Sequence, residues 1–439
     1  MKVTHVPLRP TKEASASKRQ ALTPELLAAV GARYSRSNEG LQTILAKIDP
    51  ENSDKSVDAI FKFVDYGHAS IGDLVPVALF VDGISMWLAY ELFRISPTAG
   101  GQESSTRYIK LDEDGLLSAD ELGITDGDAW QERMGTAFVA YREALAFWEQ
   151  VALDEPGRVR IPSDVNERAA ARMRRNFAFD RARYFLPVAV RTNAMLVQSA
   201  RAWVGVCQHL LSHPLPEAVR CGELIREELG LSAPRLIKHA KKLASTAAGH
   251  AAELANAQRL VGTLGTGAAT LDIMLPSGPT DFVADLAQHG NRYAYLGEGL
   301  RRTAVRFAWD GVAFAEIRDL NRHRTGTKYC PLVPVGFYAA QDESMRTLQW
   351  QPVGEGANDT ALGKLERGEP TYLYEALLGT QFPFEHTTTA DKFLYEAELR
   401  TGTGAHYRYA RHLRDVLAIW YEKFPATRGL VLEGSAEPE

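Results

Sequence analysis

The chain has 439 residues, which is too long for one ordinary hydrophobic core and suits two domains of roughly 200 residues each. Its composition, 45% hydrophobic and 24% charged, is that of a soluble globular protein, and its net charge of -5 excludes a global field that would attract nucleic acid. Three scattered cysteines without C-x-x-C spacing argue against a disulfide framework and a thiolate zinc site, and they favour a reducing compartment, so we expect a cytoplasmic protein.

The N-terminal segment has no apolar stretch of signal-peptide length, and we expect residues 1–20 to form a mobile arm. The most apolar run, residues 74–93, contains Pro76, Asp82 and Gly83. It predicts a buried strand that passes into a helix, and it does not predict a membrane span.

The stretch GGQESSTRYIKL, from Gly100 to Leu111, follows this run with glycines, hydroxyls, a carboxylate and an arginine. One interpretation is a turn, because glycine, serine and threonine satisfy their own backbone groups locally. The other is an anion site, in which hydroxyls, loop N–H groups and a guanidinium bind phosphate. This segment alone leaves both interpretations open.

Apolar residues at helical spacing predict a long amphipathic helix at about residues 127–152, and residues 194–211 and 217–230 predict two more helices. The segment HLLSH places His209 and His213 on one helical face but lacks the glutamate of a zinc protease. We therefore interpret both histidines as surface side chains and predict no metal site.

An internal repeat connects the two halves of the chain. Residues 81–96 align with residues 309–324 and share an Asp-Gly pair, a leucine and an arginine. Residues 186–210 align more loosely with residues 382–400 if six residues are dropped after the proline. We expect a first repeat at residues 21–255 with a helical insertion at 115–175, a linker at 256–275, a second repeat at 276–432, and a mobile tail at 433–439.

Three adjacent cationic groups, Arg322, His323 and Arg324, end an apolar run and precede a Thr-Gly pair. One interpretation is the end of a helix, because cationic side chains favour the last turn and glycine follows it. The other is a clamp for the pyrophosphate of a dinucleotide, which arginine binds bidentately. The sequence carries no Ser/His/Asp or Cys/His nucleophile signature.

Together, these motifs resemble those of the flavin-dependent thymidylate synthases. In that family an R-H-R triplet is followed by an E-x-S-x-R-Y cluster, which is similar to Arg94 followed by residues 103–108. The segments GHAS and ARYFLP of the first repeat are similar to the family's upstream G-H and A-R-x-x-L-P segments. In the second repeat, residues 321–324 match the triplet and residues 399–410 resemble the family's late L-R segment.

Each repeat departs from the family pattern roughly where the other retains it. The first repeat has Ile95 and Ser96 in the triplet and Leu210 at the position of the late arginine, while the second lacks the serine cluster and any arginine just ahead of Pro383. Family sites lie between subunits, so we expect the two repeats to complement each other in one composite site. The competing interpretation is decay, in which neither site is complete.

The resemblance implies an α+β fold, with an antiparallel sheet packed with helices, present twice in one chain. It implies C5 methylation of deoxyuridine monophosphate (dUMP), with methylenetetrahydrofolate as carbon donor, FAD as hydride carrier and NADPH as reductant. It also implies a homodimer that imitates the family homotetramer. The expected partner is a small pyrimidine nucleotide, and we expect neither a nucleic acid nor a membrane.

The resemblance also implies roles for individual residues. The nucleotide-binding residues would be Glu103, Ser105, Arg107, Arg183, Arg322 and Arg400, and the flavin-binding residues Arg322, His323 and Arg324. Arg400 would be catalytic, because a guanidinium can stabilise negative charge that develops on the pyrimidine. Two alternatives remain: a flavin enzyme acting on another pyrimidine nucleotide such as uridine monophosphate (UMP), and a nucleotide-binding protein whose flavin site has decayed.

Overall fold

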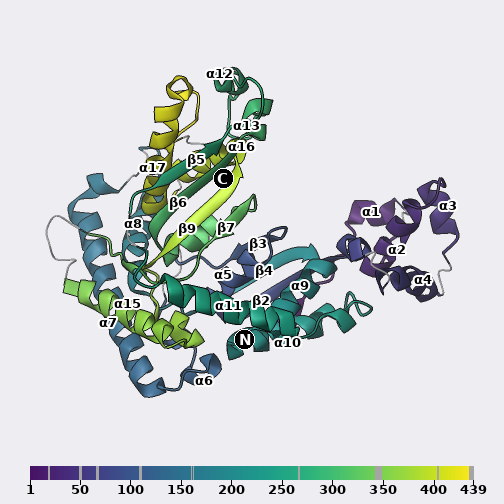
Figure 1. The fold of residues 1–439 in the computed structure, drawn as a ribbon, viewed down its shortest axis with the longest axis horizontal. Helices are drawn as coiled ribbons and strands as arrows, with labels where there is room; N and C mark the ends of the chain where they lie inside the picture. The colour runs from purple at the N-terminus through teal and green to yellow at the C-terminus, as the bar shows by residue number, and fades with distance from the viewer. Residues whose placement is uncertain are drawn as a thin grey trace. The chain divides into compact units, whose positions relative to one another are not determined.

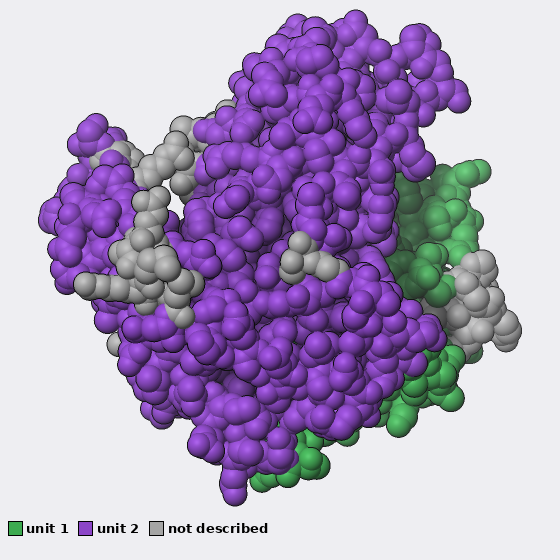
Figure 2. Space-filling model, turned by 60° about the vertical axis from the view of Figure 1, so that its left-hand side comes forward, with its two compact units in different colours: residues 1–104, 116–125, 189–252 green, residues 105–115, 126–188, 253–439 purple. Residues whose placement is uncertain are grey.

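The computed structural model describes residues 1–17, 20–48, 52–65, 69–107, 111–159, 161, 163–264, 267–341, 349–402 and 405–434. The chain divides into two compact units, which Figure 2 shows in different colours. Unit 1 comprises residues 1–104, 116–125 and 189–252, and unit 2 comprises residues 105–115, 126–188 and 253–439. Within the described residues, no helix is both long enough and apolar enough to span a bilayer.

Unit 1 is built on a four-stranded antiparallel sheet with the strand order β1-β2-β4-β3 (Figure 1). Its strands are β1 (Lys2–His5), β2 (Pro76–Ser85), β3 (Gly100–Glu103) and β4 (Arg191–Ser199). Its helices are α1 (Lys12–Ala16), α2 (Pro24–Tyr34), α3 (Leu41–Ala46), α4 (Ser53–Asp65), α5 (Met86–Arg94), α6 (Ala119–Leu122), α9 (Ala200–Leu211) and α10 (Pro216–Leu229). Helices α5 and α9 pack against the central strands and bury the apolar core between them.

Unit 2 is built on a second antiparallel sheet with the order β5-β6-β9-β7, and β8 pairs with β9 (Figure 1). Its strands are β5 (Thr270–Met274), β6 (Ala304–Ala313), β7 (Thr327–Tyr329), β8 (Gly336–Phe337) and β9 (Thr380–Thr389). Its helices are α7 (Gly127–Asp154), α8 (Glu167–Ala182), α12 (Phe282–Leu286), α13 (Glu298–Arg302), α14 (Phe314–Asn321), α15 (Gln351–Glu366), α16 (Ala390–Thr401) and α17 (Tyr407–Lys423), with the 3-10 helices η4 (Arg183–Phe185) and η7 (Pro370–Glu375). Helix α11 (Ala244–Leu260) crosses the boundary between the units.

The two sheets repeat one design, because their strand orders coincide when β1, β2, β3 and β4 are matched with β5, β6, β7 and β9. The register of β2 shifts at Gly83, which has a φ of 71°, and the register of β6 shifts at the equivalent Asp310-Gly311. Each strand then passes directly into a helix, α5 or α14. The fold is α+β with two tandem copies, and the predicted strand-to-helix passage at residues 74–93 is confirmed.

The second alignment needs no gap, so the predicted omission of six residues is wrong. Strand β4 ends at Ser199 and β9 ends at Thr389, and a helix begins at the next residue in both cases. Continuing the alignment backwards from these junctions matches Arg183 with Leu373 and Pro187 with Leu377.

A short reciprocal pairing inside unit 2 follows the same equivalence. Pro187 and Leu377 form an antiparallel bridge. Leu378 N–H donates to the carbonyl of Leu186 at 2.8 Å, and Val188 N–H donates to the carbonyl of Ala376 at 3.0 Å. Residue pairs exchanged in this way are the mark of local twofold symmetry, as in an isologous dimer contact.

Two predicted element assignments are wrong because short strands were not recognised. Residues 2–5 of the expected mobile arm form β1, which pairs with β2 and buries Val3. The expected helix at 194–211 begins only at Ala200, because residues 191–199 alternate between buried and less buried positions, as a strand does. The helices at 127–152 and 217–230 are confirmed as α7 and α10.

The expected linker at residues 256–275 is also wrong in part. Helix α11 continues to Leu260, and residues 270–274 form strand β5, which pairs with β6. The expected insertion at 115–175 contributes α7 and most of α8 to unit 2, so the compact units do not follow the repeat boundaries. Residues 435–439 of the expected tail lie outside the described residues.

Candidate functional site

The predicted arginines of unit 2 lie at the ends of helices or next to them. Arg322 caps the C-terminus of α14, and Arg400 lies in the last turn of α16. Arg183 directly follows α8 and begins η4. Helix C-termini favour cations because the backbone dipole leaves partial negative charge there, so the local fold stabilises positive charge at each of these three ends.

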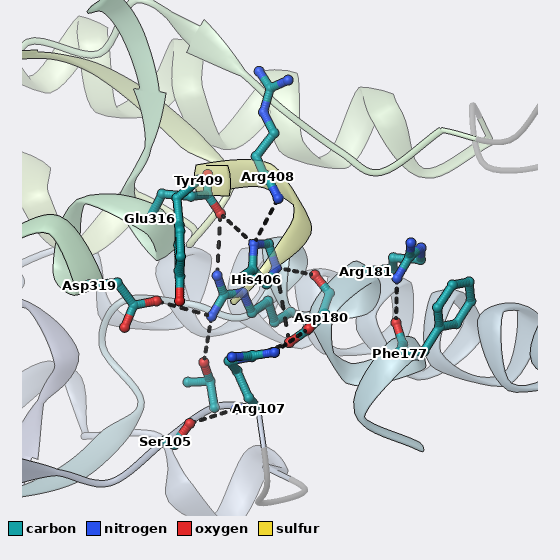
Figure 3. Close-up of polar contacts among 12 residues, drawn as sticks. Ser105, Arg107, Phe177, Asp180, Arg181, Glu316, Asp319, His406, Arg408 and Tyr409 are labelled. Atoms are coloured by element: carbon teal, nitrogen blue, oxygen red, sulfur yellow. Dashed lines mark hydrogen bonds and ion pairs between the residues drawn. The ribbon is translucent and has the colours of Figure 1, made fainter. Parts of the chain in front are cut away.

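Arg107 is fixed by a bidentate ion pair with Asp180 of α8 (Figure 3). Its Nε donates to Oδ1 at 2.7 Å and its Nη2 donates to Oδ2 at 2.9 Å. Its backbone N–H donates to the hydroxyl of Ser105 at 3.2 Å, which closes the turn after β3. The turn interpretation of this segment is confirmed at these residues, and the anion-site interpretation stays a prediction.

Arg183 is almost fully buried, with 2% of its surface exposed. Its Nη2 lies 3.3 Å from Glu316 Oε1, and its Nη1 lies 3.9 Å from Asp319 Oδ2 and 3.4 Å from the hydroxyl of Thr106. Among the described residues, Arg183 Nε has no hydrogen-bond partner. A buried guanidinium with an unused donor suits an anionic group.

Asp319 on α14 is the centre of this arginine cluster. It forms an ion pair with Arg322, three residues further along the chain. Burial acts to raise the pKa of Asp319, but the positive charges of Arg322, Arg183, Arg400 and Arg107 together outweigh burial and lower it below its ordinary value. Two arginines of the first repeat and two of the second therefore surround one carboxylate inside unit 2.

His323 is a neutral hydrogen-bond acceptor beside Arg400. Arg400 Nε donates to His323 Nε2 at 2.8 Å, and Arg400 Nη1 lies 3.3 Å from the hydroxyl of Tyr409. Burial lowers the pKa of His323 to about 3, and the charge of Arg400 acts in the same direction. The middle residue of the R-H-R triplet is thus uncharged, and the cationic character of this segment resides in its arginines.

His406, the residue before α17, lies among the carboxylates of the cluster (Figure 3). Its Nδ1 accepts from the N–H of Arg408 at 3.2 Å, and its Nε2 lies 3.1 Å from the carbonyl of Asp180. A backbone N–H only donates and a carbonyl only accepts, so the ring is neutral with its proton on Nε2. Burial, reinforced by Arg183 and Arg107, lowers the pKa of His406 well below its ordinary value.

Not all predicted site residues belong to the same compact unit, and some residues of the predicted motifs lie outside the described part of the chain. Glu103 ends β3 in unit 1, whereas Ser105 and the four arginines belong to unit 2. Arg324 is exposed, next to the buried His323. Gly67 and His68 of the GHAS segment and Tyr108 of the serine cluster lie outside the described residues.

Unit 1 contains a counterpart of the Asp319 cluster, in which the cation and the carboxylate pair with each other. Arg94, the equivalent of Arg322, donates from Nε and Nη2 to Glu91 at 2.6 Å each, and His209 Nε2 lies 2.6 Å from the same carboxylate. The predicted surface location of His209 and His213 is wrong, because His209 is part of this network and burial lowers the pKa of His213 to about 3.

The remaining partners of this counterpart are missing from the sequence. Strand pairing matches Gly100 with Thr327, so the positions equivalent to Ser105, Arg107, Arg183 and Arg400 hold Leu332, Pro334, Leu373 and Leu210. None of these four side chains carries a charge. Under the structural alignment, each repeat therefore lacks charged residues that the other repeat retains, as the sequence predicts.

Cysteine and metal chemistry find no support in the described part of the chain. Cys207 and Cys221 are buried free thiols, and burial raises the pKa of Cys207 to about 12. Among the described residues, no group of three or more histidine, cysteine, aspartate or glutamate side chains could hold a metal ion.

Sequence reasoning identified the cations of this site and missed its carboxylates. Asp180, Glu316 and Asp319 are each buried or nearly so beside an arginine. A usable signal was present, because Asp319 and Asp180 each lie three residues before an arginine of the predicted site. Glu316 was harder to find, since it shares helix α14 with Arg318 and Asp319 and no spacing distinguishes it.

Comparisons with known proteins cover about half of the chain. A UPF0159 protein of Thermoplasma acidophilum is 24% identical over 239 residues, which are 48% of this chain and 48% of the relative. A UPF0159 protein of Chlamydia muridarum is 25% identical over 246 residues, which are 50% of this chain and 45% of the relative. The chain thus spans about half the length of the curated relatives that it matches.

Two solved structures are similar at low sequence identity. One is a UMP/dUMP methylase, PolB from Streptomyces cacaoi bound with 5-Br dUMP, with 19% identity and a TM-score of 0.31 over 49% of this chain and 89% of that chain. The other is the flavin-dependent thymidylate synthase ThyX from Helicobacter pylori complexed with FAD and dUMP, with 18% identity and a TM-score of 0.35 over 55% of this chain and 100% of that chain.

The family model described as thymidylate synthase complementing protein matches residues 19–235. This range contains the serine cluster and the ARYFLP segment, and the second sheet repeats the topology of the first. On these grounds residues 19–235 belong to the thymidylate synthase complementing protein family, and the fold of this part is present twice in the chain.

Proposed function

We propose that this protein is a flavin-dependent enzyme that reductively methylates a pyrimidine nucleotide at C5, with dUMP as the substrate. Methylenetetrahydrofolate would supply the carbon and NADPH the reducing equivalents. The observation that carries the proposal is the cluster of four arginines, two from each repeat, around Asp319 within one compact unit. The proposed methylation needs no activated cysteine, in keeping with the buried thiols of Cys207 and Cys221, whose pKa values burial raises.

In this proposal the nucleotide phosphate binds to Arg107, Arg183 and Ser105. Charge-assisted hydrogen bonds to arginine contribute about 1.5–3 kcal/mol each, so these contacts dominate the affinity. Asp180 holds the guanidinium of Arg107 in a fixed plane before the ligand arrives, which lowers the ordering cost of binding. Arg183 is held less closely, at 3.3 Å from Glu316 and 3.9 Å from Asp319.

The residues at the R-H-R triplet fit a flavin dinucleotide. Arg322 has 30% of its side chain exposed and Arg324 is exposed, so both guanidinium groups reach the surface where a pyrophosphate would bind. His323 lies between them as a neutral, buried imidazole that positions Arg400 through its Nε2. A bound flavin would supply the hydride chemistry, and the protein would supply orientation and charge.

Arg400 would act on the pyrimidine. It is held from two sides, by His323 and by the hydroxyl of Tyr409. A guanidinium fixed in this way can stabilise negative charge that develops on the pyrimidine carbonyl as the ring becomes electron-rich. Its fixed position means that little reorganisation is required during the reaction.

Two other functions have specific observations in their favour. A flavin enzyme acting on UMP would use the same arginine cluster, because that cluster binds the phosphate and does not distinguish one sugar from another. A nucleotide-binding protein without chemistry is favoured by the internal neutralisation of the arginines by Asp180, Glu316 and Asp319. The proposal also includes a cytoplasmic homodimer, as the sequence predicts.

Absorbance spectroscopy and isotope release separate these functions. The proposed enzyme shows oxidised-flavin absorbance after purification or FAD addition, and NADPH bleaches it. It then releases tritium from C5 of dUMP when methylenetetrahydrofolate is present. Release from UMP alone would point to the alternative substrate, and nucleotide binding without flavin binding would contradict an enzymatic function.

A further inference from the structure

Glu316 is a fully buried carboxyl group without a full set of partners. Its exposed fraction is 0%, and its Oε1 receives the hydroxyl of Tyr184 at 2.9 Å and lies 3.3 Å from Arg183 Nη2. Among the described residues, Oε2 has no hydrogen-bond partner. A buried carboxylate that is only half satisfied is costly, and protonation of its second oxygen relieves that cost.

Three tyrosine side chains, which we call the tyrosine chain, lie between Glu316 and the surface. The hydroxyl of Tyr184 donates to Glu316 at 2.9 Å, and the ring of Tyr184 packs edge-on against that of Tyr338, with 4.8 Å between the ring centroids. The hydroxyl of Tyr338 lies 3.2 Å from that of Tyr407. Tyr184 is fully buried, whereas Tyr338 and Tyr407 are partly exposed, so these side chains lead from the surface to Glu316.

The charges around Glu316 depend on its own proton. The charged and titratable groups that face it are Arg183 and Tyr184 of η4, His406 and Arg408 at the start of α17, Tyr338 after β8, and Asp319 of its own helix. Burial raises the pKa of Glu316 to about 7, even though Arg183, Tyr184 and Arg408 oppose this shift.

A count of charges connects this proton to phosphate binding. The four clustered arginines exceed the carboxylates of Asp180, Glu316 and Asp319 by one charge when Glu316 is ionised and by two when it is protonated. A phosphate monoester carries about two negative charges above its second pKa of about 6. Protonation of Glu316 adds one positive charge to this group of side chains and therefore favours binding of the nucleotide phosphate.

We propose that Glu316 takes up a proton when an anionic phosphate group binds beside Arg183. The proton comes from solvent along the tyrosine chain, in which each hydroxyl passes its own proton towards Glu316 and accepts one from its neighbour. No electron is transferred, and the solution loses one proton for each phosphate bound. Glu316 is a positioning residue in this scheme, because it acts through Arg183. The inference rests on the proposed function only where it names a nucleotide as the carrier of the phosphate.

Calorimetric titration of dUMP at pH 6 and pH 8, in buffers of different ionisation enthalpy, measures the proton uptake. Wild-type protein takes up close to one proton more per nucleotide than Glu316→Gln at pH 8, and the difference shrinks at pH 6, where Glu316 is already protonated. At pH 8 about a tenth of the free chains hold the proton, so Glu316→Gln binds dUMP about tenfold more tightly than wild type. Glu422→Gln, an exposed control on α17, behaves like wild type. Equal proton uptake and equal affinity in wild type and Glu316→Gln at pH 8 would overturn the inference.

Inorganic pyrophosphate as a second ligand separates this inference from the proposed function. Pyrophosphate binding with Glu316-dependent uptake, without binding of dUMP or UMP, would contradict the function and support the inference. Nucleotide binding without that uptake would overturn the inference alone, and no binding of any of these ligands would overturn both. If Glu316→Gln does not fold, infrared difference spectra of wild type must show a new protonated carboxyl band on ligand addition, and its absence would overturn the inference.

The tyrosine chain is tested by kinetics. Tyr407→Phe removes one hydroxyl of the tyrosine chain but leaves Glu316 in place, so the number of protons taken up is unchanged. Stopped-flow measurement with a pH indicator then shows uptake slowed by at least about tenfold, since a positioned proton donor typically contributes ~10²–10⁴ in rate. Tyr395→Phe is the matched control outside the chain. An unchanged uptake rate in Tyr407→Phe would overturn this route for the proton.

Discussion

At the scale of the residue, the site depends on carboxylates that hold arginines in place. Asp319 stays ionised although it is buried, because four guanidinium groups lower its pKa. Asp180 fixes Arg107 through two hydrogen bonds in one plane. These acids prevent the arginines from repelling one another in the free protein, and they leave a small positive surplus for an anion.

Arg400→Ala tests the role of the held guanidinium. We expect the rate of C5 tritium release to fall by about 10²–10³, as on removal of a fixed group that stabilises developing negative charge. The unfolding free energy should change much less, because Arg400 lies at the end of α16. Arg414→Ala, at an exposed pair with Glu433, is the control. Activity within twofold of wild type in Arg400→Ala would contradict a catalytic role.

His412 gives a stability prediction with a definite sign. Burial, with Arg408 and Arg411, lowers the pKa of His412 to about 3 from its ordinary value of 6.5. Between pH 6.5 and pH 3 the unfolded chain therefore holds one more proton here than the folded chain, and acid favours unfolding. The slope is up to ~1.4 kcal/mol per pH unit for this group. In His412→Gln the loss of unfolding free energy between pH 6 and pH 5 should be smaller by up to that amount, as measured by urea denaturation.

At the scale of the element, one buried ion network joins α7, α15 and η7 in unit 2. The side chain of Glu375 has 0% exposure and accepts from Arg133 of α7 at 2.8 and 3.0 Å, and Lys364 Nζ of α15 lies 2.7 Å away. Asp126 also forms an ion pair with each of these two cations. The side-chain hydrogen bond from Lys364 is the main reason that the pKa of Asp126 is lowered to about 2. The helical segment between the strands of the first repeat is thereby attached to unit 2.

Glu375→Gln should destabilise unit 2 by about 3 kcal/mol or more, because it leaves buried Lys364 with one partner and an uncompensated charge. Chemical denaturation measures the effect, and Glu132→Gln on the exposed side of α7 serves as control. A loss below about 1 kcal/mol would show that this network contributes little to the stability of these elements.

Several elements could be predicted from the sequence because their patterns are local. The passage from strand to helix at residues 74–93 and the long helix α7 follow from apolar periodicity. Strands β1, β4 and β5 could not be identified in this way, because they are short or lead without a break into a helix. The carboxylates of the site were missed because their function depends on contacts between α8 and α14, which are far apart in sequence.

At the scale of the whole molecule, the two repeats together contain the charged side chains of one site per chain. The cluster around Asp319 contains Arg107, Arg183, Arg322 and Arg400, whereas the positions equivalent to Arg107, Arg183 and Arg400 are Pro334, Leu373 and Leu210. In place of those charges, Glu91 forms an ion pair with Arg94 and lies 2.6 Å from His209 Nε2.

Calorimetric titration should accordingly give one nucleotide bound per chain. The same stoichiometry is expected for FAD, measured from flavin absorbance against protein concentration in the saturated protein. A value of two per chain would mean that the second cluster is also functional and that its uncharged positions do not prevent binding.

The most direct test of the account is the dissociation constant of dUMP for Arg107→Ala and for Arg400→Ala, each measured by calorimetry beside the surface control Arg142→Ala. If both repeats contribute to one site, each site variant weakens binding by roughly 10- to 150-fold, which corresponds to about 1.5–3 kcal/mol per charged hydrogen bond, and the control binds like wild type. Wild-type affinity in either Arg107→Ala or Arg400→Ala would contradict the central claim that the two repeats form one composite nucleotide site.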